Sequence, residues 1–465
     1  MRKFPLTYYF ILGLIFLLAI ALWVFMFWNS NHGANQQYDY DQNNPISRIG
    51  NNPIIPIGGG NNTGNNTGNI PPNLIGYRPI QNPNLIDDDE SKRQIVSDLV
   101  NVAIKDSVNR IEDFIQSFNS TYDTNDYVIN YVDTLINYAQ IKVPEAERVN
   151  FKTGIKSKLD QFSLLVWDET IFKSNATKST LQPNWHLDKT GISRLNYVFQ
   201  PDSVTIAIID NGFDLSHPSF TRKNPKTFNA TDGSSDVSPG PKNHGTHVAS
   251  IALGSNINDI EGVCPSCNIM PIKVEDNNGI LSSNYIIKGI LYAIKNKADV
   301  INLSLGASIG TSNIPIAYQE NFIGNGAKDE EAFWKELFEY AENNKTICVL
   351  AAGNDNILTG FDPFQRSKET IKVGAIDSNG QKASFSNFGK NTTIYAPGVE
   401  IFGAKPNRQF EPQSGTSMAA PIVSGFVGLL KSVDKNRDFD QINKLLIKNS
   451  EIQNGLRVLT YKTLN

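Results

Sequence analysis

Residues 414–421 read Ser-Gly-Thr-Ser-Met-Ala-Ala-Pro and run directly into an apolar segment, Ile422–Leu430. That segment has the character of a buried helix, so Ser417 is expected at the start of a helix. The first backbone N–H groups of a helix have no partner within the helix and favour negative charge. Ser417 is therefore a candidate nucleophile, with donors nearby for a developing oxyanion.

Two further motifs supply a carboxylate and an imidazole. Val204–Ile209 is rich in β-branched residues, as is typical of a strand buried on both faces of a parallel sheet, and Asp210 follows it. Open α/β sheets keep their sites at the carboxyl ends of such strands. His244 stands at the amino end of another apolar helix. Its His-x-x-His spacing with His247 lacks the glutamate of the zinc proteases, so we expect no metal site there.

Asp210, His244 and Ser417, in this order, resemble the subtilisin family of serine endopeptidases (subtilases). The order differs from that of trypsin-like enzymes and α/β-hydrolases. The resemblance runs from about Leu181 to the carboxyl end. Other segments that carry it are SLG at 304–306, AAGN at 351–354, VGAID at 373–377, FSNFG at 385–389 and APGVEI at 396–401. It implies an α/β fold in which a mostly parallel central sheet carries helices on both faces.

The resemblance also implies the role of each triad residue. Ser417 would attack the peptide carbonyl, and His244 would take the serine proton and later protonate the leaving amine. Asp210 would hold the imidazole in the required tautomer. No cofactor is required for this chemistry.

Four more residues receive roles from the same resemblance. The side-chain amide of Asn354, with the Ser417 backbone N–H, would hold the oxyanion. Ser304, Leu305 and Gly306 would form the strand that pairs with an extended polypeptide substrate.

Three departures from the family pattern leave alternatives open. The family often binds structural calcium, and loop 254–261 offers oxygen ligands, although the family's own ligands do not match residue by residue. The candidate oxygen ligands in this loop are Asn256, Asn258, Asp259 and Glu261. Cys264 and Cys267 form either a short disulfide or two free thiols. Ala307–Gly326 predicts an irregular insertion, followed by a helix at Ala327–Asn343; the insertion either walls the substrate cleft or is a peripheral loop.

The amino terminus predicts a membrane anchor. Residues 1–7 include Arg2 and Lys3 and precede an uncharged apolar run, 8–28, that is long enough to cross a bilayer as a helix. Basic residues before the run place 1–7 in the cytoplasm and the catalytic part outside the cell, in a single-pass cell-membrane protein. The alternative is a removed signal peptide, whose apolar stretch would be shorter.

Two segments separate this anchor from the peptidase domain, which we place at 181–465. Residues 29–87 are rich in Asn, Gly and Pro and predict a disordered linker. Residues 88–180 carry apolar residues spaced by three and four, which predicts a small helical domain, accessory or propeptide-like. We expect it to persist or to be cut between about Lys173 and Pro183.

The charge balance of the chain argues against nucleic acid as a partner. Lys and Arg total 42 and Asp and Glu total 46, so the chain has no basic excess for binding nucleic acid. The expected partners are a polypeptide substrate and, through the amino-terminal helix, a membrane; the oligomeric state is not predicted. The leading function is hydrolysis of extracellular proteins. The alternatives are a maturation protease for a secreted or surface precursor, and a catalytically dead surface binding protein on the same scaffold.

Overall fold

The computed structural model describes most residues from 83 to 463. The gaps are 90, 106–109, 135, 174–182, 193–202, 221–224, 241–242, 258–259, 308 and 310–313. The predicted anchor at 8–28 and nearly all of the predicted linker lie outside the described residues. Among the described residues, one helix, Thr416–Val433, is long and apolar enough to span a membrane, and 89% of its apolar window is buried inside the protein.

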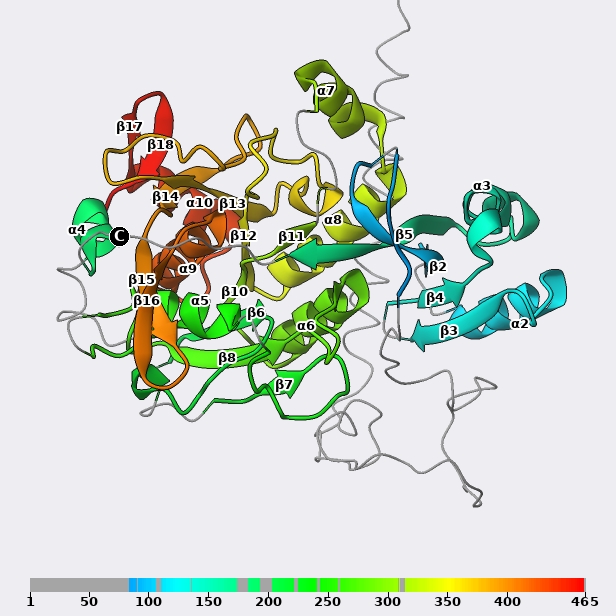
Figure 1. The fold of residues 1–465 in the computed structure, drawn as a ribbon, viewed down its shortest axis with the longest axis horizontal. Helices are drawn as coiled ribbons and strands as arrows, with labels where there is room; N and C mark the ends of the chain where they lie inside the picture. Colours follow the sequence, from blue (N-terminus) through cyan, green and yellow to red (C-terminus); the bar gives the residue numbers. More distant parts are fainter. Residues whose placement is uncertain are drawn as a thin grey trace, which may run out of the picture. The chain divides into compact units, whose positions relative to one another are not determined.

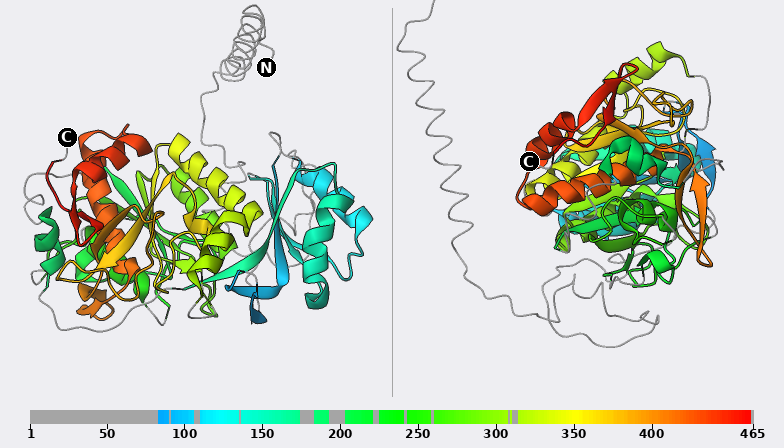
Figure 2. Two further views of the ribbon diagram at one scale, coloured as in Figure 1. Left: turned by 90° about the horizontal axis from the view of Figure 1, so that it is seen from above. Right: turned by 90° about the vertical axis from the view of Figure 1, so that its left-hand side faces the viewer.

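Residues 85–173 form an antiparallel sheet with two helices, so the prediction of a helical domain at 88–180 is wrong. The main elements are β2 (Gln94–Ile104), α2 (Ile111–Thr121), β3 (Val128–Asp133), β4 (Tyr138–Lys142), α3 (Arg148–Lys158) and β5 (Leu164–Lys173). The strand order is β5-β2-β4-β3, and all neighbours are antiparallel, as in ferredoxin-like βαββαβ domains. Both helices lie on one face of this sheet (Figure 2). We call residues 85–173 the N-terminal domain.

Strand β2 explains the wrong prediction. Nearly all of its residues are buried, so the alternation typical of a half-exposed strand is missing. Its register with β5 shifts between Ile95 and Val100, and such an irregularity gives the apolar residues a helix-like spacing. The preference of Val and Ile for strands decides the structure here. The predicted helical spacing matches real helices in α2, where Ile111, Phe114, Ile115 and Phe118 are buried, and in α3, where Phe151 and Ile155 are buried.

The peptidase domain contains a nine-stranded sheet in the order β17-β18-β14-β13-β12-β10-β6-β8-β7. The strands are β6 (Thr205–Asp210), β7 (Phe228–Asn229), β8 (Asn268–Lys273), β10 (Val300–Leu303), β12 (Ile347–Ala351), β13 (Thr370–Ile376), β14 (Ile394–Pro397), β17 (Ser450–Gln453) and β18 (Leu456–Leu459). All neighbours are parallel except β17 and β18. The predicted α/β class with a mostly parallel sheet is confirmed.

Helices cover both faces of this sheet (Figure 1). Helices α5 (His244–Leu253) and α9 (Thr416–Val433) pack on each other, and α9 approaches Ile206 of β6 at Gly428. Helix α6 (Ser283–Lys295) approaches Ile209 of the same strand at Gly289. Residues 206 and 209 point to opposite faces of a strand, so α9 and α6 lie on opposite sides of the sheet.

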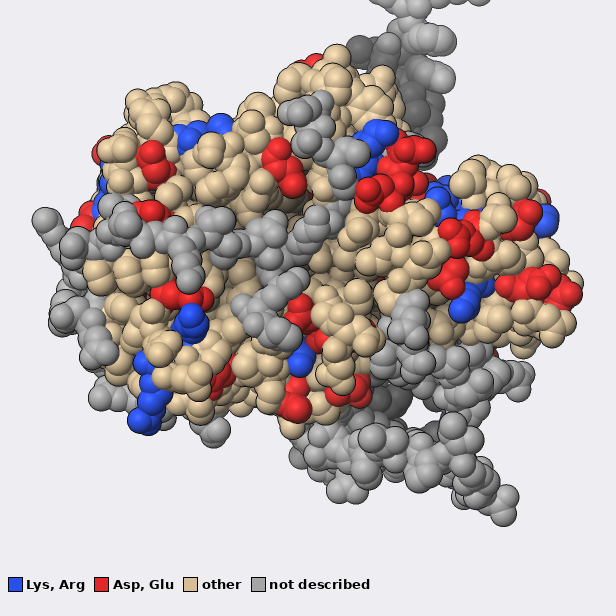
Figure 3. All heavy atoms as spheres, in the orientation of Figure 1, with Lys and Arg blue, Asp and Glu red and all other residues tan. Residues whose placement is uncertain are grey.

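The remaining elements surround this core. They are α4 (Trp185–Thr190), β9 (Leu281–Ser282), β11 (Gly306–Ala307), α7 (Ile316–Asn325), α8 (Lys328–Asn343), the hairpin β15 (Ile401–Lys405) with β16 (Gln409–Gln413), and α10 (Phe439–Lys448). On the face drawn in Figure 3, basic and acidic side chains are interspersed over the described part of the chain.

Candidate active site

The site lies where two neighbouring parallel strands end. Asp210 is the last residue of β6, and Ile209 pairs with Leu303, the last residue of β10. In the sheet, β8 and β7 lie on one side of β6. The strands on its other side are β10, β12, β13 and β14. Such a switch in strand order opens a crevice at the carboxyl ends of the strands.

His244 faces Asp210 at this edge of the sheet. Its Nδ1 lies 2.9 and 3.0 Å from the two carboxylate oxygens of Asp210, and both side chains are almost fully buried. A carboxylate accepts hydrogen bonds, so Nδ1 carries the proton and Nε2 keeps a free lone pair. Nε2 is buried and has no hydrogen-bond partner among the described atoms. The imidazole is therefore arranged as a base that can accept a proton at Nε2.

The close approach of α5 to β6 requires a glycine next to the histidine. A Cβ on Gly245 would lie 2.5 Å from the carbonyl oxygen of Gly212 and 2.9 Å from Cβ of Asp210. The Gly245 N–H donates to the side-chain oxygen of Asn211 at 3.0 Å. These contacts hold the first turn of α5 against the end of β6.

Ser417 is the second residue of α9 and is buried. Its hydroxyl donates to the carbonyl oxygen of Ser304 at 3.1 Å, and the Ser304 hydroxyl donates to the carbonyl oxygen of Ser417 at 2.8 Å. The serine hydroxyl therefore bonds to Ser304 rather than to His244 in this structure. Transfer of its proton to His244 requires the hydroxyl to turn, and catalytic hydrogen bonds often form only when substrate is bound.

Asn354 lies in the loop after β12, and its orientation is set by Thr416. The Thr416 backbone N–H donates to Oδ1 of Asn354 at 2.8 Å, and the Thr416 hydroxyl donates to the same oxygen at 2.9 Å. Because a backbone N–H only donates, the partner atom must be the amide oxygen. Nδ2 of Asn354 is left to donate elsewhere, as an oxyanion site beside the Ser417 N–H requires.

The three residues predicted to bind substrate run from the site into β11. Gly306 and Ala307 of β11 pair antiparallel with Lys173 and Phe172 of β5, while Ile171 and Phe172 also pair with β9. The carboxyl end of β5 thus lies between β9 and β11. An extended chain of the N-terminal domain is paired where a substrate strand was expected.

The predicted insertion is partly helical rather than irregular, because α7 occupies Ile316–Asn325. The guanidinium of Arg366 binds the carbonyl oxygens of Phe322 and Gly326 at 3.2 and 2.7 Å and so fastens the end of α7. The helix predicted at Ala327–Asn343 is present as α8. Whether the insertion shapes the cleft stays a prediction, which a deletion of residues 309–324 would test by its effect on the cleavage profile.

Sequence reasoning missed the groups that support these residues. Thr416 orients Asn354, and Asn302 donates to the Ser304 hydroxyl at 2.9 Å while accepting from the Ser424 hydroxyl at 2.8 Å. The signal was present, since Asn302 is a polar residue inside an otherwise apolar strand. A buried amide must find partners.

The structure answers the question of the cysteine pairing and leaves calcium binding a prediction. Cys264 and Cys267 form a disulfide, and Cys348 is free and buried. No three acidic, His or Cys side chains gather into a metal-binding set within the described residues. The predicted calcium loop includes Asn258 and Asp259, which lie outside those residues, so calcium stays a prediction.

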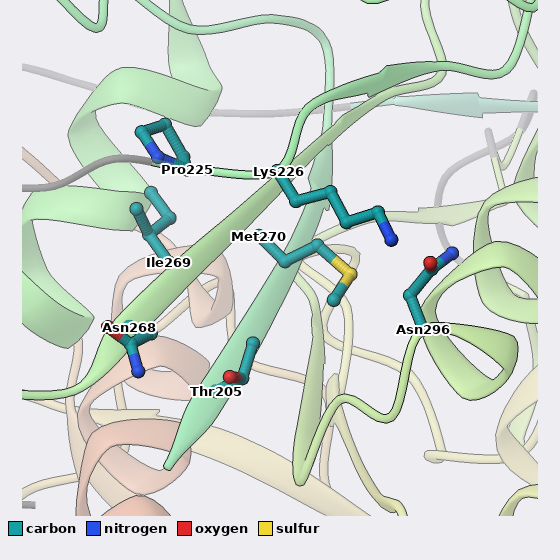
Figure 4. Close-up of a pocket in the computed structure, with 7 residues that line it drawn as sticks. All are labelled: Thr205, Pro225, Lys226, Asn268, Ile269, Met270 and Asn296. Atoms are coloured by element: carbon teal, nitrogen blue, oxygen red, sulfur yellow. The ribbon is translucent and has the colours of Figure 1, made fainter. Parts of the chain in front are cut away.

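A separate hollow lies at the opposite ends of the strands. It is lined by Thr205, Pro225, Lys226, Asn268, Ile269, Met270 and Asn296. Figure 4 shows the Lys226 side chain reaching toward Asn296. Thr205 and Asn268 begin β6 and β8, whereas Asp210 ends β6, so this hollow is not part of the candidate site.

Comparison with known proteins agrees with this geometry. Residues 202–461, more than half of the chain, match the Peptidase_S8 family, described as the subtilase family. The chain belongs to the subtilase family. It is 36% identical over 233 residues to a thermophilic serine proteinase of Bacillus sp. (strain AK1), covering 50% of this chain and 53% of that protein. It is 34% identical over 229 residues to thermitase of Thermoactinomyces vulgaris, covering 49% of this chain and 74% of that protein. The matched part spans about half the length of the first curated relatives.

Two crystal structures share the fold over more than the peptidase domain. Fervidolysin from Fervidobacterium pennivorans, a keratinolytic enzyme related to subtilisin, gives a TM-score of 0.61 at 20% identity, covering 83% of this chain and 62% of that chain. The epidermin leader peptide processing serine protease of Staphylococcus aureus gives 0.60 at 20% identity, covering 78% and 97%. At this identity the two structures support the fold, and the fold agrees with the subtilase family match.

Proposed function

We propose that this subtilase is a serine endopeptidase that hydrolyses extracellular proteins through Asp210, His244 and Ser417. The supporting observations are the buried Asp210–His244 pair and the position of Ser417 at the start of α9, the helix that packs on α5. Nε2 of His244 takes the proton from Ser417 as its oxygen attacks the peptide carbonyl, and the imidazolium then protonates the leaving amine. Asn354 and the Ser417 N–H hold the oxyanion, and water hydrolyses the acyl-enzyme by the reverse path.

Digestion of a denatured protein tests this proposal. The wild-type chain should cut it at many sites, and Ser417→Ala should produce no cuts. Ser432→Ala is the matched control, because it makes the same change near the other end of α9. Cuts that persist in Ser417→Ala would refute the proposed nucleophile.

A processing protease for a secreted or surface precursor is the second candidate. The name of the Staphylococcus aureus protein describes such a role, and its structure resembles 78% of this chain. At 20% identity that likeness supports the fold alone. Substrate profiling separates the two functions: many cuts in unfolded proteins favour general proteolysis, and one preferred sequence favours processing.

We further infer that the N-terminal domain inhibits the site and is cut off by it. The end of β5 pairs with β9 and β11 on both sides, which blocks the strand expected to receive substrate. In addition, Glu169 of β5 is fully buried and accepts the Asn284 N–H, at the first turn of α6, at 3.5 Å. A carboxylate at the amino end of a helix stabilises the docked arrangement.

The strand register predicts where the cut falls. Lys173 pairs with Gly306 in an antiparallel ladder. If a substrate chain continued this pairing, the residue two positions after the one that faces Gly306 would face Ser304. The Ser304 carbonyl oxygen binds the Ser417 hydroxyl, so the bond after that residue is nearest the nucleophile. Counted on this chain, the cut follows Asn175. Intact masses should show a break within about two residues of this bond in wild type and none in Ser417→Ala; an unbroken active chain would refute self-cleavage.

We also propose that the apolar run 8–28 anchors the protein in the cell membrane with the peptidase domain outside. The support is its uncharged length and the basic residues before it. Exchange of 8–28 for a cleavable signal peptide should release the enzyme into the medium. Release of the unaltered chain would favour a removed signal peptide.

A further inference from the structure

A buried arginine of the N-terminal domain occupies an acidic site on the peptidase domain. Arg93 Nη1 lies 2.9 Å from Oε1 of Glu330 and 3.5 Å from Oδ1 of Asp362, and its Nη2 lies 2.5 Å from Oε2 of Glu330. All three residues are at most 5% exposed. Glu330 thus binds the guanidinium through two parallel contacts, a geometry that the ammonium group of lysine does not provide.

Both carboxylates also accept hydrogen bonds from the peptidase domain itself. Oδ2 of Asp362 accepts the N–H of Ala307 at 2.9 Å, and its Oδ1 accepts the N–H of Phe364 at 3.2 Å. Glu330, in the first turn of α8, accepts the indole N–H of Trp334 at 3.2 Å. Among the described residues, Arg93 is the one cation within ion-pair distance of either carboxylate. Each carboxylate therefore has a donor within the peptidase domain in addition to Arg93.

This acidic site adjoins the strand expected to bind substrate. Ala307, whose N–H is held by Asp362, belongs to β11 and faces Phe172 of β5. The Phe172 ring packs edge-on against Phe364, two residues from Asp362, with centroids 5.5 Å apart. A side chain in the Phe172 position is thus directed at the aromatic wall beside the acidic site. By the register given above, that position is the fourth residue before the cut bond.

Departure of the N-terminal domain would remove Arg93 and Phe172 together. Removing one partner of a buried ion pair leaves an uncompensated charge, which is strongly unfavourable. Here two carboxylates would remain, both held by donors of their own domain. A long basic side chain of a substrate that reaches past Phe364 would restore the ion pairs with Glu330 and Asp362.

We propose that Glu330 and Asp362 form a substrate subsite that binds an arginine at the fourth position before the cut bond, and that Arg93 fills this subsite while the N-terminal domain is docked. The inference rests on the proposed endopeptidase function and names the substrate class for it. Arginine is favoured over lysine, because only its guanidinium reproduces the two-point contact.

The test uses the full chain in detergent after self-cleavage, with quenched peptides that differ only at this fourth position. The arginine peptide should have a kcat/KM about tenfold or more above that of the leucine peptide, as charge-assisted hydrogen bonds contribute that much. Glu330→Gln should lose most of this preference, because the guanidinium then lacks its bidentate carboxylate partner. Glu339→Gln, the same change on an exposed part of α8, should keep the preference. Equal rates for arginine and leucine peptides in wild type would overturn the proposal.

A second measurement needs neither cleavage nor activity. In the full chain, Arg93→Ala should leave a space beside Glu330 that a guanidinium group can fill. Ethylguanidinium should therefore raise the Tm of this variant. It should not raise the Tm of the double variant Arg93→Ala, Glu330→Gln. No difference between the two would overturn the acidic subsite. Labelling of Ser417 by a fluorophosphonate reports the nucleophile separately, so failure of the subsite and failure of the endopeptidase function give different results.

Discussion

Thr416 donates two hydrogen bonds to the side-chain oxygen of Asn354, from its backbone N–H at 2.8 Å and from its hydroxyl at 2.9 Å. The residue beside the proposed nucleophile thus fixes the amide oxygen of Asn354 and leaves Nδ2 to donate elsewhere. The Thr416 hydroxyl also accepts the N–H of Gly353 at 3.1 Å, which ties the end of β12 to the start of α9. Thr416 therefore links the segment of the proposed nucleophile to the proposed oxyanion donor.

Asn354→Leu should lower kcat about 10²–10³-fold with little change in KM, because an oxyanion donor acts mainly on the transition state. Thr416→Val removes one of the two bonds to Asn354 and should lower kcat by only about 2–10-fold. Thr416→Ser keeps the hydroxyl and serves as the control. Steady-state kinetics on one peptide measure all three variants, and an unchanged kcat in Asn354→Leu would remove this residue from the mechanism.

Two buried histidines outside the triad should make the fold acid-sensitive. Burial lowers the pKa of His186 to about 3 and that of His247 to about 4, from an ordinary 6.5. Below pH 6.5 the unfolded chain binds more protons than the folded one, so the free energy of unfolding falls until the folded pKa values are passed. At pH 5 each histidine should cost about 2 kcal/mol.

Urea unfolding of the Ser417→Ala chain at pH 7 and pH 5 measures this loss without self-digestion. His186→Leu should lose about 2 kcal/mol less than its parent between the two pH values. The same pH dependence in both proteins would show that His186 does not titrate as its burial requires.

The disulfide predicts a simple thiol count. Under denaturing conditions without reductant, one thiol per chain should react, that of Cys348, and three should react after reduction. Loss of the disulfide in the Cys264→Ala, Cys267→Ala variant should lower the free energy of unfolding by about 2 kcal/mol, because the closed loop is short. Three reactive thiols before reduction would contradict the bond.

Sequence patterns predicted the peptidase domain well because its chemistry is local. Asp210 ends β6, His244 begins α5 and Ser417 lies in the first turn of α9. Buried parallel strands also produce apolar runs that are easily recognised. The N-terminal domain was assigned wrongly because β2 is buried on both faces and irregular, which mimics a helical period. The Arg93–Glu330 pair joins residues 237 positions apart, and no local pattern signals such a contact.

The central claim is that Ser417 is an activated nucleophile. A fluorophosphonate probe, read by intact mass on the self-cleaved chain, tests it most directly. We expect a single adduct on the wild type and on Ser432→Ala, and none on Ser417→Ala. No adduct on folded wild-type protein freed of its N-terminal domain, or an adduct that survives Ser417→Ala, would contradict the claim. The first of these results would favour a non-catalytic binding protein on the same scaffold.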